Sequence, residues 1–160
     1  PKSLLRHKRA VSKLEDFGPC TSLNRELPET GDLVARTKIK RVVLCSGKVY
    51  FDLLAAREEM KISNVALVRL EQLYPFPSIS LSKELKKYPN ADVVWCQEEP
   101  KNMGAWTFMD RRIEELLGNV DIDAERPIYA GRPEAASPAT GSHGKHTREQ
   151  QALVEDALII

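Results

Sequence analysis

The stretch from Arg41 to Arg57, RVVLCSGKVYFDLLAAR, decides the fold. It begins with four consecutive apolar residues, Val42 to Cys45, a pattern typical of a strand buried on both faces of a sheet. From Val49 the apolar residues instead recur every three or four positions, which predicts a helix that Ser46 would cap. The buried stripe of this helix would consist of Val49, Leu53, Ala56 and Met60.

The turn between this strand and helix, Ser46-Gly47-Lys48, is the first candidate binding site. A helix N-terminus offers unpaired N–H groups and a partial positive charge, and Lys48 adds a full charge. We therefore predict that Ser46, Gly47 and Lys48 bind a phosphate, with Gln72 contacting the same ligand from the end of the next predicted strand. The alternative is that the three residues only form a good strand-to-helix turn. The turn is not a P-loop, because the earlier glycine and the Ser or Thr after Lys48 are missing.

The rest of the chain alternates strands and helices. Apolar runs predict further strands at Val65 to Leu70, Asp92 to Cys96 and Pro127 to Gly131, each followed by a helix. This order is typical of an α/β fold with a mostly parallel sheet and helices on both faces, in which ligands bind beyond the carboxyl ends of the strands. The caps expected for the second and the last of the four helices are Ser78 or Ser80, and Thr147, respectively.

Two polar pairs are weaker candidates for a site. Glu98 and Glu99 follow the third predicted strand, where carboxylates suit general acid/base catalysis, but adjacent side chains diverge and a structural role is the better interpretation. His143 and His146 are three residues apart, as metal ligands can be, but no Cys or carboxylate stands nearby at a suitable spacing. We therefore predict no catalytic residue and no metal site.

The first 40 residues look different from the rest. Residues 1–40 are rich in charge, Pro and Gly, so we expect a linker and an irregular segment with a short helix near Ala10 to Leu14, followed by one domain over residues 41–160. The basic residues of this segment, Arg6 and Lys8 among them, would either stay solvated or contact a phosphate. The chain starts at Pro1 without a Met, which we interpret as a piece of a longer protein that includes its C-terminal domain.

Composition excludes several classes of protein. The 160 residues are 42% hydrophobic and 29% charged with a net charge of +1, as in ordinary globular proteins. The basic clusters lack interleaved aromatic residues, which argues against nucleic acid, and no apolar run or signal peptide points to a membrane. The three cysteines, Cys20, Cys45 and Cys96, show no metal-ligand spacing and favour a reducing compartment.

Five stretches closely resemble the C-terminal region of one family, the thiamine-diphosphate-dependent decarboxylase subunit of the 2-oxoglutarate dehydrogenase complex. The resemblance covers nearly the whole chain, is weakest from Cys20 to Lys40, and is bacterial in character over KNMGAW. The stretches are PKSLLRHKRA, RVVLCSGKVYFDL, VRLEQLYPFP, YPNADVVWCQEEPKNMGAW and YAGRPEAASPATGSHGKH.

This resemblance implies a fold similar to the C-terminal domain of transketolase, with five strands of which one is antiparallel. It also implies a homodimer that decarboxylates 2-oxoglutarate and passes the succinyl group to a lipoyl-bearing acyltransferase. Thiamine diphosphate and magnesium serve that reaction, but their Gly-Asp-Gly and Asn-Asn motif is absent here, since Leu33 follows Gly31-Asp32. The cofactors therefore belong to the parent subunit, in the cytoplasm of bacteria or the mitochondrial matrix of eukaryotes.

The leading hypothesis is thus a non-catalytic domain that supports dimerisation. Some relatives are regulated by acetyl-CoA or AMP, which agrees with the phosphate predicted at Ser46-Gly47-Lys48. A second hypothesis is a self-sufficient CoA- or nucleotide-binding module. A third is an independent enzyme that uses Glu98, Glu99 and Lys48, but no nucleophile–base pair or dinucleotide fingerprint supports it.

Overall fold

A single five-stranded sheet forms the centre of the chain in the computed structural model, which describes residues 2–18 and 24–160 and so leaves Cys20 outside the described residues. The strand order is β1-β3-β2-β4-β5, with β1 antiparallel to β3 and all other pairs parallel. This confirms the predicted α/β fold with its mostly parallel sheet. The strands are β1 (Glu26–Leu27), β2 (Arg41–Cys45), β3 (Val65–Leu70), β4 (Asp92–Pro100) and β5 (Ile128–Arg132).

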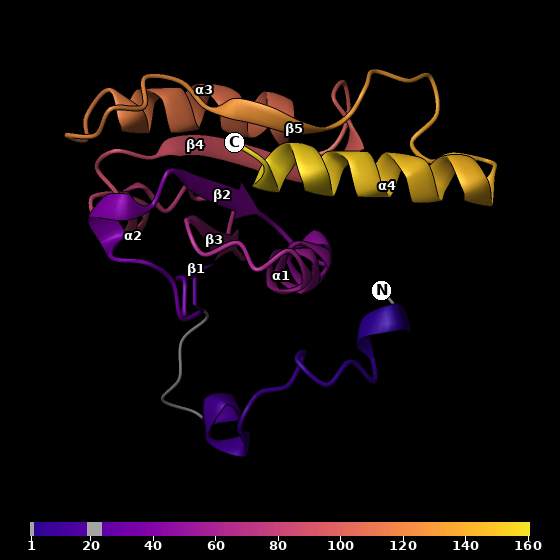
Figure 1. Cartoon of the computed structure of the whole chain (residues 1–160), viewed down its shortest axis with the longest axis horizontal. Coiled ribbons are helices and arrows are strands. Elements are labelled where there is room, and N and C mark those ends of the chain that lie inside the picture. The colour runs from indigo at the N-terminus through magenta and orange to yellow at the C-terminus, as the bar shows by residue number, and fades with distance from the viewer. Residues whose placement is uncertain (1, 19–23) are drawn as a thin grey trace.

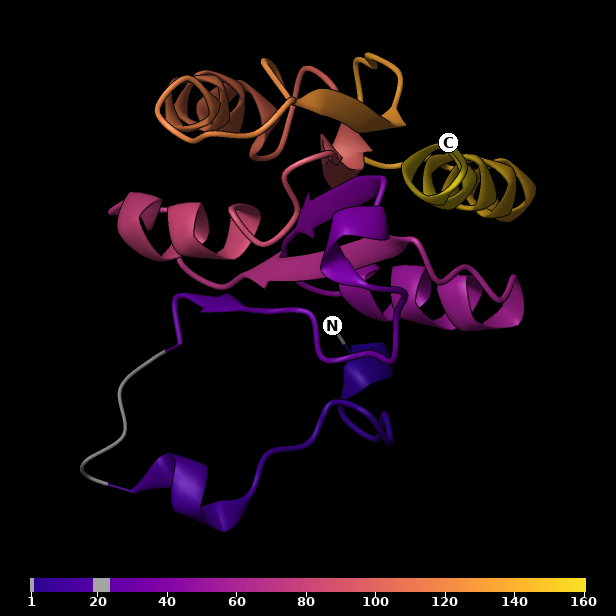
Figure 2. The same cartoon turned by 60° about the vertical axis from the view of Figure 1, so that its left-hand side comes forward.

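Helices cover both faces of the sheet (Figure 1, Figure 2). One apolar cluster joins one face to α1 and α4, and a second joins the opposite face to α2 and α3. Three short 3₁₀ helices, η1 to η3, precede β2. The bounds are η1 (Lys2–Leu4), η2 (Leu14–Phe17), η3 (Arg36–Lys38), α1 (Val49–Glu59), α2 (Ser78–Leu85), α3 (Trp106–Leu117) and α4 (His143–Leu158).

The core follows from the apolar strands. All five residues of β2 are buried, and alternate side chains enter opposite clusters: Leu44 packs with α2 and α3, while Val43 packs with α1 and α4. Val43, Val68 and Val94 are each 0% exposed, as expected for central strands. The apolar runs therefore placed these three strands correctly.

The predicted stripe of α1 is only partly right. Val49 and Leu53 are buried, but the helix ends at Glu59 and Met60 is 42% exposed. Phe51 and Arg57 are buried instead, because α1 also packs against segments that precede β2: Phe51 contacts the ring of His7, and Arg57 pairs with Glu29. A helix with neighbours on two sides buries more than one stripe.

The three capping predictions are wrong, since no described side chain caps α1, α2 or α4. Lys48 is the N-cap of α1, so Ser46 lies too far ahead of the helix. Pro77 is the N-cap of α2, whose Ser80 hydroxyl donates to the Pro77 carbonyl oxygen at 3.2 Å. Helix α4 already begins at His143, so Thr147 falls inside it and its hydroxyl donates to the His143 carbonyl oxygen at 3.0 Å.

Residues 24–40 are less irregular than predicted. They supply β1, the antiparallel edge strand, and the backbone of Val34 and Lys40 donates to carbonyl oxygens just ahead of β3. The expected short helix lies at Leu14–Phe17 as a 3₁₀ turn rather than near residues 10–14. Within the described residues, no helix is both long enough and apolar enough to cross a bilayer.

Candidate functional site

The carboxyl end of the sheet gathers most of the polar side chains that the sequence singled out. Helices α1 and α3 leave β2 and β4 toward opposite faces, so the ends of these two neighbouring strands form the switch point where α/β sheets bind ligands. The turn after β2 is sharp at Gly47, whose φ of +73° lies in the left-handed region. Nothing stands within 4 Å of where a Cβ of Gly47 would be, so the turn is open.

Lys48 is already paired with two carboxylates. Its ammonium donates to Asp52 of α1, four residues on, and to Oε1 of Glu98 of β4 at 3.3 Å. Partial burial lowers the pKa of Lys48, but the hydrogen bond that Lys48 donates to Asp52 and the charges of Glu98 and Asp52 outweigh it and raise that pKa above its ordinary value. Lys48 is therefore protonated at neutral pH. An anion at this turn would have to compete with both carboxylates for its ammonium group.

The four residues of the predicted phosphate site are only partly brought together. Ser46, Gly47 and Lys48 form the turn, whereas the side-chain amide of Gln72 donates to the Pro75 carbonyl oxygen at 2.7 Å and so binds its own loop. Gln72 does follow β3, the neighbour of β2. The phosphate site over these residues stays a prediction.

Strand β4 is longer than predicted and runs to Pro100 through both glutamates. Glu98 is half-buried beside Lys48, whereas Glu99 is exposed, so the two carboxylates diverge as successive strand residues do. They therefore do not converge on one substrate atom. This favours the structural interpretation of the pair.

The sequence interpretation missed Gln97, which lies in β4 directly before Glu98. It is 4% exposed, and its Oε1 accepts hydrogen bonds from the Trp95 indole at 3.0 Å and from the Trp106 backbone at 2.9 Å. Its Nε2 donates to the Met103 carbonyl oxygen at 2.7 Å. Gln97 thus fixes the β4–α3 connection, and its amide groups are fully engaged.

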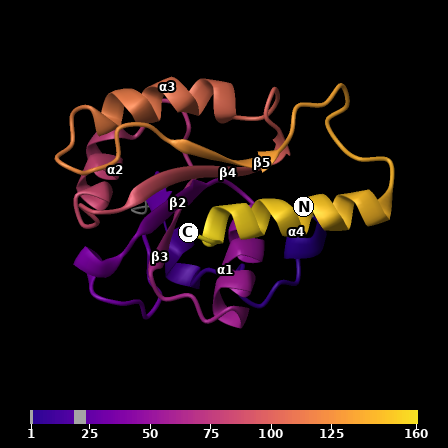
Figure 3. The same ribbon diagram turned by 45° about the horizontal axis from the view of Figure 1, so that its top comes forward.

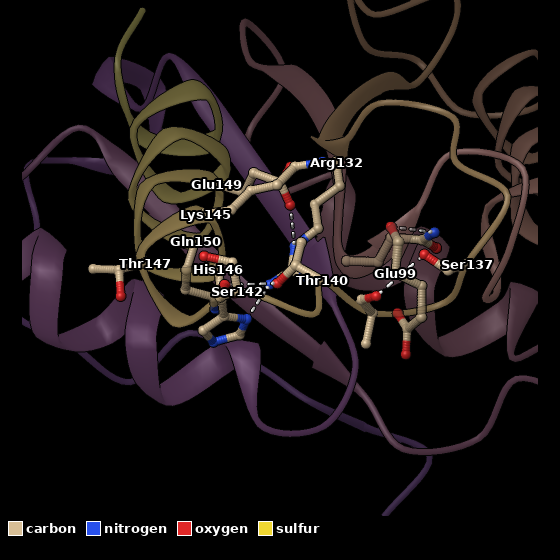
Figure 4. A network of polar contacts seen from close by, with 12 residues as sticks. Glu99, Arg132, Ser137, Thr140, Ser142, Lys145, His146, Thr147, Glu149 and Gln150 are labelled. Atoms are coloured by element: carbon tan, nitrogen blue, oxygen red, sulfur yellow. Dashed lines mark hydrogen bonds and ion pairs between the residues drawn. The ribbon is translucent and has the colours of Figure 1, made fainter.

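Arg132, also missed, is the centre of a second set of polar contacts (Figure 4). It ends β5 and is only 6% exposed. One Nη2 contacts His146 Nδ1 at 2.9 Å and donates to Gln150 Oε1 at 3.1 Å, both on α4, and Nε lies 3.6 Å from the Glu149 carboxylate. Gln150 in turn donates to Asp52 at 2.9 Å, which links this set to Lys48. We call the connected side chains the carboxyl-edge network; they are Lys48, Asp52, Glu98, Arg132, Lys145, His146, Glu149 and Gln150.

A cavity of about 400 Å³ adjoins this network, between residues 133–142 and the start of α4. Arg132, Lys145 and Glu149 line it, with small residues of the loop opposite. Lys145 lies 3.5 Å from Glu149, so both cations in the wall share one carboxylate. Glu134 also lines the cavity, so its wall has two cations and two carboxylates and is close to electrically neutral.

The chemistry available here is limited. Burial raises the pKa of the Cys45 thiol well above its ordinary value and that of Cys96 to about 12, so neither is a thiolate nucleophile near neutral pH. Across residues 2–18 and 24–160, no group of three or more His, Cys, Asp or Glu side chains is arranged to hold a metal ion. His146 contacts Arg132 instead. The network ties α1 and α4 to the sheet.

Comparison with known proteins supplies the remaining evidence. A family model described as "2-oxoglutarate dehydrogenase C-terminal" matches residues 11–158. The 2-oxoglutarate dehydrogenase E1 component of Brucella anthropi is 52% identical over 166 aligned residues that cover 99% of this chain and 17% of the relative. The same component of Brucella ovis is 51% identical and is covered to 16%.

A solved structure described as a split-gene transketolase, an inactive beta4 tetramer, has the same fold. Its TM-score is 0.55 at 16% sequence identity, and the match covers 89% of this chain and 44% of that one. The E1 relatives are far longer than the match, since the chain spans only 16–17% of their length.

Proposed function

The chain belongs to the family of 2-oxoglutarate dehydrogenase C-terminal domains, and from this premise we propose that it serves a 2-oxoglutarate dehydrogenase E1 subunit as a non-catalytic domain. The parent would decarboxylate 2-oxoglutarate oxidatively and transfer the succinyl group to a lipoyl-bearing acyltransferase. The Brucella relatives are bacterial, which supports a bacterial parent. That the parent is a cytoplasmic homodimer is part of the proposal and follows from the family resemblance. The domain would help to hold its two copies together.

The residues here do not suit the cofactors of that reaction. Thiamine diphosphate is held through a divalent metal, which needs oxygen ligands such as carboxylates. The described part of the chain has no such cluster, and the sequence lacks the Gly-Asp-Gly and Asn-Asn motif. No step of the reaction is therefore assigned to this domain.

The non-catalytic role is supported mainly by the carboxyl-edge network, in which the charged side chains pair with one another. The charged members of this network at the carboxyl end of the sheet are paired with one another, whereas Glu99 is exposed and lies outside the network. Such pairing fixes α1 and α4 on the sheet and leaves no free base or nucleophile within the network. The polar residues that suggested catalysis thus support architecture.

The test compares this chain with the full-length subunit. Supplied with 2-oxoglutarate, thiamine diphosphate, magnesium and an electron acceptor, the chain alone should show no turnover, while the full-length subunit turns over under the same conditions. Turnover by the purified chain would refute the non-catalytic role. An inactive full-length subunit, whatever the chain does, would refute the assignment to this enzyme.

A second function is favoured by the open turn at Gly47. We propose that Ser46, Gly47, Lys48 and Gln72 bind a phosphate of acetyl-CoA or AMP at the switch point. The ligand would draw Lys48 partly away from Asp52 and Glu98, and Gln72 away from Pro75. Binding would therefore tighten when a substitution such as Glu98→Gln removes one of the carboxylates that compete for Lys48.

Calorimetric titration of the full-length subunit with acetyl-CoA and with AMP tests this site. Lys48→Ala should lose one charge-assisted contact of roughly 1.5–3 kcal/mol, about 10- to 150-fold in affinity. The matched control is Arg41→Ala, because Arg41 begins β2 at the opposite end of the sheet. Equal losses in both variants, or unchanged binding in Lys48→Ala, would place the ligand elsewhere.

A further inference from the structure

The segment Lys2–Gly18, which we call the N-terminal arm, lies outside the α/β body. Figures 1 and 2 both show it beyond β1 and α1, away from the rest of the sheet. Two side-chain contacts are seen between the arm and α1: the rings of His7 and Phe51 lie 4.9 Å apart, and the Arg9 guanidinium donates to the Glu58 carboxylate. Both contacts come from the first half of the arm, which is the half that lies against α1.

The arm carries an unusual number of exposed apolar side chains. Leu5 is 82% exposed, Val11 76%, Leu14 85% and Phe17 75%. Leu14 and Phe17 belong to η2, and residues three apart in a 3₁₀ helix project to the same side. Exposed apolar residues scattered singly are ordinary, whereas four within 13 residues of one segment are a concentration that favours an interaction site, and we call these four side chains the patch of the arm.

We propose that the arm docks through Leu5, Val11, Leu14 and Phe17 onto a preceding part of the same polypeptide. The proposal rests on the proposed function, in which the chain is the C-terminal domain of a longer E1 subunit. The matched relatives have about five-sixths of their length outside the match, and the family model begins only at residue 11, within the arm. The arm is therefore the segment nearest to the remaining polypeptide.

The size of the patch favours the same polypeptide over a second copy. Four such side chains offer on the order of 500 Å², whereas a stable interface between separate proteins buries about 800 Å² per partner. A covalent connection removes this requirement, because it raises the effective concentration of the partner surface to about the millimolar range. A small patch is then sufficient.

The charges of the arm indicate the chemistry of its partner surface. The four cations Lys2, Arg6, Lys8 and Lys13 outnumber the two carboxylates of the arm, Glu15 and Asp16, while Arg9 is already paired with Glu58. The complementary surface would be an apolar groove with carboxylates on its rim. This replaces the earlier interpretation of the arm as a solvated linker.

Photo-crosslinking in the full-length subunit identifies the partner. We would replace Phe17 with benzoylphenylalanine, irradiate, separate products on a denaturing gel and map the linked peptides. The expected product runs at the mass of one subunit and joins the arm to a peptide outside the matched region. The control carries the same residue at Ile79 of α2, which is 76% exposed, and should not label that peptide. A product at twice the subunit mass, links only within the domain, or no product would overturn the proposal.

Hydrogen–deuterium exchange gives an independent measure on the same full-length subunit. In the wild type, peptides covering residues 11–18 should exchange at least about tenfold more slowly than an unstructured peptide. Leu14→Glu combined with Phe17→Glu should remove that protection, whereas Ile79→Glu should leave it intact. A wild-type arm that exchanges like an unstructured peptide contradicts the docking. Neither measurement depends on activity. A subunit without decarboxylase activity would contradict the proposed function, but the docking of the arm could still be tested on it.

Discussion

The two ends of the sheet use their cations in different ways. At the amino end, Arg41 and Arg57 are 8% and 4% exposed, and each holds a chain segment in place. At the carboxyl end, Lys48 is 28% exposed and stands at an open turn, although it too is paired. The comparison teaches that charge alone does not indicate a site: a buried arginine with backbone partners is architecture, whereas a half-exposed lysine at a strand end can exchange partners.

The arginines of the amino end have well-defined partners. Arg41 Nη1 donates to the carbonyl oxygens of Asp156 at 3.1 Å and of Ile159 at 2.6 Å, at the C-terminal end of α4. Arg57 Nη2 donates to Glu29 Oε1 at 3.1 Å, and its Nη1 donates to the carbonyl oxygen of Val65 at 3.0 Å. Both therefore satisfy groups that would otherwise be buried without partners.

The largest expected effect is the loss of the buried Arg57–Glu29 pair. Arg57→Ala would leave the Glu29 carboxylate buried without its cation and should cost roughly 3–5 kcal/mol in the free energy of unfolding. Urea unfolding measures this loss. The control is Arg111→Ala, which removes an exposed pair with Glu114 and should cost at most about 1 kcal/mol. Similar losses in the two variants would mean that the amino end is not the more rigid one.

Replacing Arg41 should have the next largest effect. Arg41→Ala leaves the last carbonyl oxygens of α4 unpaired and should cost roughly 1.5–3 kcal/mol. Hydrogen exchange near residues 156–160 should accelerate more than elsewhere in the domain. If Arg41→Ala instead left stability unchanged and weakened acetyl-CoA or AMP binding, the assignment of roles to the two ends would be reversed.

The pH dependence of stability sharpens the comparison through Glu29. Burial raises the pKa of Glu29, but hydrogen bonds from Arg57 and from the backbone of Leu67 and Gly31 outweigh it, so its folded pKa lies below the ordinary 4.5. A lowered folded pKa means that the contribution to stability is present above 4.5 and is lost as the pH falls through the folded value. The wild type should therefore be more stable than Glu29→Gln at neutral pH, and the difference in unfolding midpoint should shrink on acidification below about 4.5. A difference that stays constant down to pH 3 would contradict this account.

The smallest effect on stability should come from Lys48. Because its two partners are partly exposed, Lys48→Ala should cost no more than about 1 kcal/mol after solvent screening. Thermal unfolding of Lys48→Ala and Arg41→Ala, measured side by side, checks that Lys48→Ala loses less stability. A loss as large as that of Arg41→Ala would show that the carboxyl end is braced as tightly as the amino end.

The sequence predicted the centre of the sheet well because its signal is local. Val65–Leu70 was predicted with its observed bounds, since the four consecutive apolar residues from Val65 to Val68 fit a strand covered on both faces. Strand β1 could not be found in this way, because Glu26 and Leu27 are a two-residue edge whose pairing with β3 is a tertiary contact. The extension of β4 through Gln97, Glu98 and Glu99 was missed for a similar reason, since a polar run does not suggest a strand.

The site was harder to predict than the fold. Lys48 was found because a glycine turn before a helix is visible in sequence, but its two carboxylate partners come from α1 and β4. Arg132 was missed although a cation directly after a predicted strand, at Gly131-Arg132, was an available signal. Its partners on α4 lie 14 to 18 residues further on, across a loop whose path the residue pattern does not specify.

Helix α4 connects the two ends of the sheet mechanically. Figure 3 shows it lying along the sheet with its C-terminal end beside β2. Arg132, from the end of β5, holds its first turns, and Arg41, from the start of β2, holds its last carbonyl oxygens. With 16 residues at about 1.5 Å each, α4 is a rod about 24 Å long that is pinned at both ends. If α4 slid along its axis, the contacts at both of its ends would change together, so the two ends of the sheet share one helix as a common brace.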